Sequence, residues 1–333
     1  MRMEELPDTK SMTRIDAYTH VLTEQFFTDL KETYGVGELS GSPDWLWDVE
    51  RREQDMADFD VDKQVITLAL PTLWRGLDPE TALPIVRDAN DAIRGLADDH
   101  PDLFVPVGTI PFATEPFREE FERCVSDLDM AGAQIFSNVD GRPIDGPAFE
   151  ALYAIAERED APLWIHPQHH PWYDWVDDYM DHRLFGWPFD TTLALSRLVF
   201  SGIMDRHPDL SIISHHGGGM VPFYGERIRM FYEQREEYPD NYPGAQEWPD
   251  YSKPPVEYFS GFYADTATSG SAIAIDCAGR FFEDGRVVFG TDYPFSPERG
   301  RRALRRTVEA IDSLDLAADE REAIYGGNLE AII

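Results

Sequence analysis

Four polar residues follow short apolar runs that are typical of buried β-strands. His20 comes after the first run, His166 ends the fifth, His216 follows the sixth and Asp292 follows the eighth. Two imidazoles and one carboxylate, here His20, His166 and Asp292, form a known ligand set for catalytic zinc, with one position open for water. His216 would then act as a base toward that water. Each residue alone also has an ordinary structural interpretation, such as a buried histidine or a turn aspartate.

The elements that must position these residues form a repeating pattern of strand and helix. Segments 116–129, 147–160 and 298–314 have helical periodicity and lie between the apolar runs. Eight strands that alternate with helices predict a parallel sheet, and its closure gives a (β/α)8 TIM barrel, here a single domain over residues 1–333. The four polar residues would share the rim where this fold keeps its active sites. The predicted strands are 14–18, 64–70, 104–110, 132–137, 162–166, 210–214, 261–266 and 286–291.

Three long connections add to the barrel: 23–45 after strand 1, 167–190 after strand 5 and 236–258 before strand 7. Loops that follow strands lie on the catalytic face, so the first two are expected to wall or cover the site. The aromatic segment 167–190 suits a subunit interface equally well, because such interfaces favour Trp and Tyr. His169 and His170 in this segment either contact a substrate or lie in an exposed loop, and the loop is the simpler interpretation.

Three glycines, Gly217 to Gly219, follow His216 and precede a predicted helix that begins near Val221. They would allow close approach of a ligand to a helix N-terminus, or they form a tight turn that needs positive φ. His215 is adjacent to His216 and would point to the opposite side of an extended segment, so a structural role is expected for it. Cys124 and Cys277 fall in predicted helices and have no metal or disulfide spacing.

The chain is strongly acidic, with a net charge of -34. Such a surface repels nucleic acid and anionic membranes, which excludes both as partners. Selection for solubility in high salt, as in a halophilic, acidic proteome, is the simplest explanation, and an acidic protein of ordinary habitat is the alternative. The N-terminus has no secretory signal and no stretch is apolar enough to span a membrane, so a cytoplasmic location is expected.

Several stretches resemble the amidohydrolase superfamily, in the branch that contains aminocarboxymuconate semialdehyde decarboxylase. The resemblance covers nearly the whole chain and implies a (β/α)8 barrel with one divalent metal, most often zinc. It implies that His20, His166 and Asp292 are metal ligands, that His216 is the catalytic histidine and that Arg52 binds a substrate carboxylate. The stretches are IDAYTHV, WDVERREQDMADFDV, ERCVSDLDMAGAQI, LYAIAEREDAPLWIHP, HPDLSIISHHGGGMVPFYGERI and VVFGTDYPFSP.

Tyr18 departs from the family pattern, because the related decarboxylase has a histidine at this position. Three interpretations remain: Tyr18 binds the metal as phenolate, contacts metal-bound water or substrate, or turns away. We favour the last two, since three ligands suffice for catalytic zinc, and assign Tyr18 to substrate binding. Arg52 has its own alternative as a solvated helix residue, and a shift of register by one residue would place the neighbouring Arg51 at the site instead.

The predicted activity is a metal-dependent, cofactor-independent decarboxylation of a small unsaturated or aromatic carboxylic acid by a homodimer. His216 would accept a proton from metal-bound water, and Arg52 would bind the carboxylate in a bidentate manner. Hydrolysis of a lactone, amide or related bond is the alternative on the same site, because fold alone does not decide the reaction. A catalytically silent barrel that binds a small molecule is supported only by Tyr18.

Overall fold

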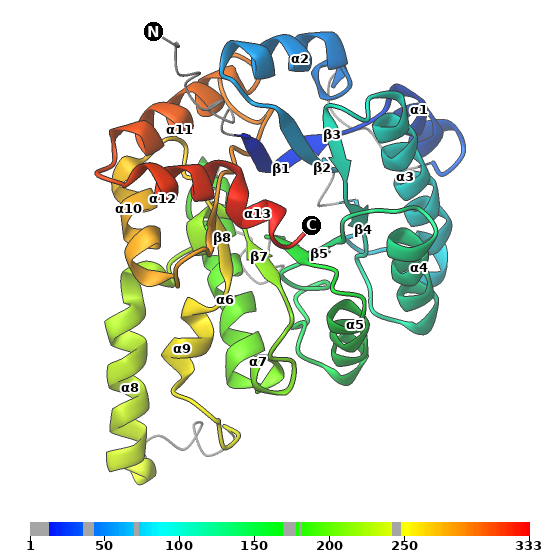
Figure 1. The fold of residues 1–333 in the computed structure, drawn as a ribbon. Coiled ribbons are helices and arrows are strands. Elements are labelled where there is room, and N and C mark those ends of the chain that lie inside the picture. Colours follow the sequence, from blue (N-terminus) through cyan, green and yellow to red (C-terminus); the bar gives the residue numbers. More distant parts are fainter. Residues whose placement is uncertain (1–12, 36–42, 70–72, 169–177, 180–181, 242–247) are drawn as a thin grey trace, which may run out of the picture.

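A ring of short parallel strands lies at the centre of the molecule and helices surround it (Figure 1). The computed structural model describes residues 13–35, 43–69, 73–168, 178–179, 182–241 and 248–333. Neighbouring strands pair in parallel wherever the chain is described. The strands are β1 (Ile15–Val21), β2 (Lys63–Leu68), β3 (Phe104–Pro106), β4 (Gly108–Thr109), β5 (Ala133–Phe136), β6 (Leu163–His166), β7 (Ile212–Ser214), β8 (Tyr263–Asp265) and β9 (Val287–Val288).

The ring is closed by hydrogen bonds between β1 and the residues that follow β9. The Ala17 amide donates to the Phe289 carbonyl at 2.7 Å. β3 and β4 occupy one position in the ring, because the Val107 amide between them donates to the Ile66 carbonyl of β2 at 3.1 Å. The predicted (β/α)8 barrel is therefore confirmed, and the run predicted as one strand at 104–110 is divided at Val107.

The helices lie outside the strands and cover the ring (Figure 1). Three predicted helices are confirmed with small changes at their ends, as α4, α5 and α11. Among the described residues, no helix combines the length and apolar character that crossing a membrane requires. The helices are α1 (Glu24–Glu32), α2 (Val49–Asp58), α3 (Pro79–Asp99), α4 (Glu115–Ser126), α5 (Pro147–Arg158), α6 (Trp187–Phe200), α7 (Ile203–Arg206), α8 (Gly225–Glu237), α9 (Pro255–Ser260), α10 (Ala272–Phe281), α11 (Arg301–Ser313), α12 (Ala318–Glu322) and α13 (Asn328–Glu330).

Large side chains fill the inside of the barrel. Tyr18 and Trp164 are fully buried there, and the Trp164 indole N–H donates to the Ala17 carbonyl at 2.9 Å. Leu329 of α13 packs against the same apolar cluster as Ile15 at the start of β1. The interior is thus filled by side chains, which leaves the carboxyl ends of the strands and their loops to form a site.

All three long connections contain regular structure where they are described. Segment 23–45 holds α1 and the start of the 3₁₀ turn η1 (Asp44–Leu46), and segment 236–258 holds the end of α8 and the start of α9. Segment 167–190 includes the π-helical turn η3 (His182–Gly186) and the start of α6. His169 and His170 lie outside the described residues.

Arg52 joins α2 to the first two strands of the barrel from a buried position. Its side chain is 2% exposed, and one Nη donates to the His20 carbonyl at 2.6 Å while the other donates to Gln64 Oε1 at 2.8 Å. The guanidinium also lies 4.7 Å from the centre of the Tyr293 ring. The Arg52 guanidinium therefore donates to acceptors of the protein itself and is shielded from solvent. This geometry supports neither the predicted binding of a substrate carboxylate nor the alternative of a solvated helix residue.

Replacing Arg52 with methionine should lower the free energy of unfolding by about 2 to 4 kcal/mol, because two buried acceptors lose their donor. Urea unfolding followed by circular dichroism measures the loss. Arg51→Met is the matched control: Arg51 lies on the same helix, is 37% exposed, and should contribute less than about 1 kcal/mol. Equal losses in both variants would contradict a structural role for Arg52.

Candidate active site

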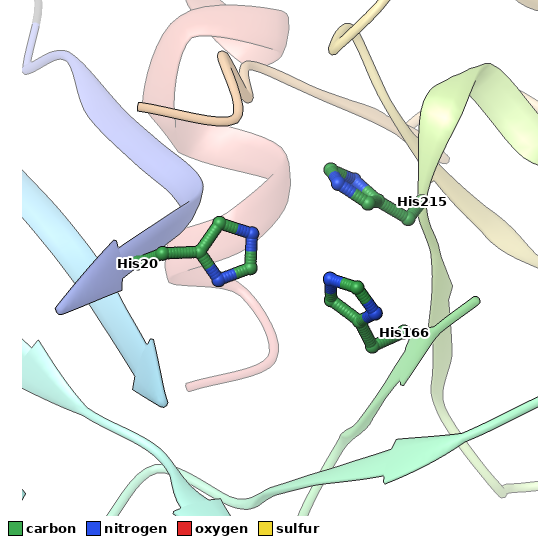
Figure 2. A group of neighbouring side chains, drawn as sticks. All are labelled: His20, His166 and His215. Carbon is green, nitrogen blue, oxygen red and sulfur yellow. The ribbon is translucent and has the colours of Figure 1, made fainter. Parts of the chain in front are cut away.

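Three histidines from three strand ends point toward the same space at the rim of the barrel (Figure 2). His20 lies near the end of β1, His166 is the last residue of β6, and His215 follows β7 directly. One nitrogen of each lies within 4.8 Å of one nitrogen of the others. All three side chains are buried, so their imidazoles face one another in a region protected from water.

A hydrogen bond fixes the orientation and tautomer of His20. The Thr67 hydroxyl donates to the Thr19 carbonyl at 3.0 Å, so it must accept from His20 Nδ1–H at 2.9 Å. The proton of the neutral ring is therefore on Nδ1, and the lone pair of Nε2 faces the centre of the cluster. Burial lowers the pKa of His20, which keeps this ring neutral at neutral pH.

His166 and His215 are oriented by the same principle. His166 Nδ1 lies 2.7 Å from the Pro167 carbonyl, which can only accept a proton. His215 Nδ1 donates to the carboxylate of Asp265, whose other oxygen accepts from the Gly217 amide at 3.1 Å. Each ring thus carries its hydrogen on Nδ1 and presents Nε2 to the centre, the arrangement by which proteins orient metal-binding histidines.

The pKa values of these two rings are shifted in opposite directions. Burial lowers the pKa of His166 well below 6.5. Burial also acts to lower the pKa of His215, but the carboxylates of Asp265 and Asp292 outweigh it and raise this pKa to about 9. His215 is therefore the one of the three rings whose pKa lies above neutral, and a metal ion would have to displace the proton from its Nε2.

Asp292 completes the cluster and provides the test of whether it fits a metal. Its Oδ1 lies 3.0 Å from His20 Nε2 and 3.5 Å from His215 Nε2. Neutral His20 with its proton on Nδ1 has a lone pair facing this carboxylate, and two acceptors so close repel each other unless a cation lies between them. Among the described residues, the buried Nε2 atoms of His20 and His215 have no hydrogen-bond partner. The donor set therefore fits a divalent metal ion.

His216 lies beside His215, and this corrects the expectation that the two would point to opposite sides. The backbone of His216 has a φ of 55°, so the chain leaves the extended conformation and both rings turn to the same side. Their ring centres are 3.8 Å apart, and the ring of His216 stacks on Trp187. Burial, followed by the charge of His215, lowers the pKa of His216 to about 3. His215 therefore belongs to the site, and its signal in the sequence is the histidine pair before three glycines.

The glycines that follow make this turn possible. Gly217, Gly218 and Gly219 all have positive φ, and a Cβ on Gly218 would lie 2.5 Å from the ring of Phe282. α8 begins only at Gly225, several residues later. The structure therefore supports the tight turn rather than the predicted anion site at a helix N-terminus.

A cavity of about 600 Å³ opens above the histidines. Trp45 comes from segment 23–45, and Trp187 and Arg183 come from segment 167–190, so both connections contribute to its walls. Phe295 packs edge to face on Trp45 at 5.2 Å and lies 5.3 Å from the ring of His20. Its lining residues are Trp45, Ala69, His166, Arg183, Trp187, His215, His216, Asp292, Pro294, Phe295, Ser296 and Arg299.

Tyr18 lies beneath the histidines and is absent from the cavity lining. Its side chain is fully buried, its ring centre is 4.1 Å from that of His215, and its hydroxyl donates to Gln134 Oε1 at 3.4 Å. Burial raises its pKa well above 10, so the phenol is neutral. Of the three interpretations of Tyr18, this position favours the one in which the ring turns away from metal and substrate. Arg52, described above, also lies outside the cavity lining.

Comparison with known proteins agrees with this geometry. A family model described as amidohydrolase matches residues 15–332. A relative from Dictyostelium discoideum, 2-amino-3-carboxymuconate-6-semialdehyde decarboxylase, is 28% identical over 95% of this chain and 90% of its own length.

Two solved structures have the same fold. The 5-carboxyvanillate decarboxylase of Sphingomonas paucimobilis superimposes with a TM-score of 0.83 at 22% identity, over 97% of this chain and 99% of its own. A mutant 5-carboxyvanillate decarboxylase of Novosphingobium aromaticivorans, with bound manganese and 3-methoxy-4-hydroxy-5-nitrobenzoic acid, gives 0.79 at 22% identity, over 96% of each chain. With its closed barrel, its histidine cluster and a family match over nearly its whole length, the chain belongs to the amidohydrolase family.

Proposed function

We propose that this protein is a metal-dependent decarboxylase of a small aromatic or unsaturated carboxylic acid. The observation that carries the proposal is the convergence of three Nε2 lone pairs and the Asp292 carboxylate at the base of a cavity with aromatic walls. Relatives named as decarboxylases of such acids support the reaction class. Because related sites can also support hydrolysis, lactone or amide cleavage remains the alternative that the experiments below must separate.

The metal would be held by His20, His166 and Asp292, the predicted set, with His215 as a further donor. Imidazole-rich sites suit zinc, so zinc is the proposed ion, although a solved relative contains manganese. When bound, the cation supplies Lewis acidity that polarises an oxygen of the substrate and stabilises negative charge that develops on it.

His216 is the group best placed to move a proton. It lines the cavity, and its Nδ1 is buried with no hydrogen-bond partner in the described part of the chain. Because its pKa is lowered to about 3, the ring is neutral at neutral pH and can accept a proton. In decarboxylation the bond between the substrate carbon and the carboxylate breaks, and His216 would pass to that carbon a proton that it has first accepted from a water molecule, which becomes hydroxide, as carbon dioxide leaves. Trp187 stacks on His216 and limits the orientations of the imidazole.

Replacing His166 with alanine should remove most of the bound metal, because the cluster loses a donor whose orientation is fixed by the Pro167 carbonyl. Elemental analysis of the purified protein measures the metal and identifies it. We expect about one zinc per chain in the unmodified protein and at least a tenfold lower affinity in the variant. His100→Ala, at the end of α3, is the control and should keep the metal. Full metal content in His166→Ala would contradict the site.

Decarboxylation and hydrolysis are distinguished by their products. The metal-loaded protein should release carbon dioxide from members of a panel of hydroxybenzoates and unsaturated acids, and should not cleave lactones or amides. His216→Asn should lower kcat about 10²- to 10⁴-fold, the usual contribution of a proton-transfer group, while the metal content stays unchanged. Lactone cleavage without release of carbon dioxide would support the hydrolase instead.

We also propose a homodimer, on the basis of exposed apolar side chains on the 3₁₀ turn η5 (Pro222–Tyr224) and on α8. Phe223 is 77% exposed, and Tyr224, Met230 and Phe231 are exposed near it. Large apolar side chains grouped in this way are typical of protein contacts. Light scattering should therefore give about twice the mass of the chain. Phe223→Asp with Met230→Asp should give the monomer mass, and an unmodified protein that is monomeric at micromolar concentration would exclude the dimer.

A further inference from the structure

Arg52 is a buried cation with no part in the proposed reaction. Its side chain is 2% exposed, and it lies outside the lining of the cavity. A charge buried in this way destabilises a protein unless it is paired and hydrogen-bonded. The contacts of the guanidinium therefore have to account for its position.

The first of these contacts fix the backbone that carries His20. One Nη of Arg52 donates to the His20 carbonyl at 2.6 Å, while the other donates to Gln64 Oε1 of β2 at 2.8 Å and lies 3.4 Å from the Thr19 hydroxyl. Hydrogen bonds from a charged donor are strong, and the planar fork of arginine also fixes their direction. The peptide of His20 is thereby held against β2, while its ring is held separately by Thr67.

The same guanidinium contacts the segment that carries Asp292. It lies over Tyr293, 4.7 Å from the ring centre, and Tyr293 directly follows Asp292. The Tyr293 hydroxyl donates at 2.9 Å to Asp55, which comes three residues after Arg52 on the same face of α2. The His20 amide donates to the Tyr293 carbonyl at 2.8 Å, so α2 and the two segments form one connected set of contacts.

Arg52 thus supports both members of the pair His20 Nε2 and Asp292 Oδ1, which lie 3.0 Å apart at the rim. We propose that Arg52 is a positioning residue of the metal site, which holds these two donors at the separation that a metal ion needs. The inference rests on the metal site of the proposed function and deepens it. It differs from the predicted binding of a substrate carboxylate, because that role would leave the metal affinity unchanged.

The charge and the geometry of Arg52 affect metal affinity in opposite directions. A buried cation repels a metal ion, whereas fixed donor atoms need less reorganisation when the metal binds. The carboxylate of Asp55 attracts the guanidinium and offsets part of its charge. Outer contacts of metal ligands commonly change metal affinity by about 10- to 100-fold, so we expect the effect of geometry to exceed that of charge.

Zinc affinity, measured by competition with a chromogenic chelator, tests the proposal without requiring turnover. Arg52→Lys keeps the charge but not the planar fork, and Arg52→Met removes both. Each variant should bind zinc at least about tenfold more weakly under conditions where circular dichroism shows it to be folded. If Arg52→Met does not fold, Arg52→Lys decides. Arg51→Met removes a cation of the same helix that is 37% exposed, and should keep the affinity within about twofold.

Glu120→Gln is the matched control for a loss of stability alone. Glu120 is 1% exposed on α4 and accepts from Asn90 and Arg123, each at 2.8 Å, so the substitution also disturbs buried charged contacts. It lies outside the cavity lining, and it should lower the free energy of unfolding while the zinc affinity stays unchanged. A second measurement is calorimetric titration with benzoate at saturating zinc, in which Arg52→Lys should match the unmodified protein within about twofold.

Unchanged or tighter zinc binding in either folded Arg52 variant would overturn the inference. So would an equal loss of zinc affinity in Glu120→Gln, because stability alone would then account for the effect. Weaker benzoate binding at unchanged zinc affinity would mean that Arg52 binds the substrate carboxylate instead. An unmodified protein that takes up no zinc would refute the metal site and the inference together. A protein that binds zinc through these contacts but releases no carbon dioxide would refute only the decarboxylase.

Discussion

The site depends on the close approach of two acceptors, His20 Nε2 and Asp292 Oδ1, at 3.0 Å. These atoms come from opposite ends of the sequence, and the closure of the barrel between β1 and the residues after β9 brings them together. The Asp292 amide donates to the Tyr18 carbonyl at 3.2 Å, so the same backbone contact that closes the ring sets the position of the carboxylate. If the barrel were open at this point, His20 Nε2 and Asp292 Oδ1 would not lie close together, and the rim would lack this pair of donor atoms for a cation.

Below the rim, the groups that support the site are polar, buried and almost completely paired. Arg52 holds the carbonyl of His20, and Thr67 holds its ring. Asp16 accepts from the Thr291 amide at 3.0 Å, directly before Asp292, and burial raises the pKa of Asp16 to about 7. These contacts leave the facing imidazole atoms little freedom, which lowers the reorganisation needed when a metal binds.

The sequence predicted the barrel and the rim well because strand ends are marked by apolar runs followed by polar residues. It failed at His215 because the alternation of side chains holds only while the chain is extended, and the left-handed backbone of His216 could not be inferred from residue types alone. Arg52 was misplaced for a different reason: its burial depends on acceptors from two strands, β1 and β2, whose register with α2 is a tertiary property. Arg183 and Arg299 carried no motif, and only the folded cavity places them together.

The arrangement of charge also explains how so acidic a protein can select an anion. The donors at the base of the cavity are buried, so a metal there would interact with a carboxylate in a medium of low polarity, where salt screens little. The arginines at the walls are exposed, and their interactions weaken as salt rises. The general repulsion from the acidic surface is screened by the same salt. Salt therefore reduces both the repulsion and the wall contacts, whereas binding of a carboxylate beside the buried donors at the base should depend least on the salt concentration.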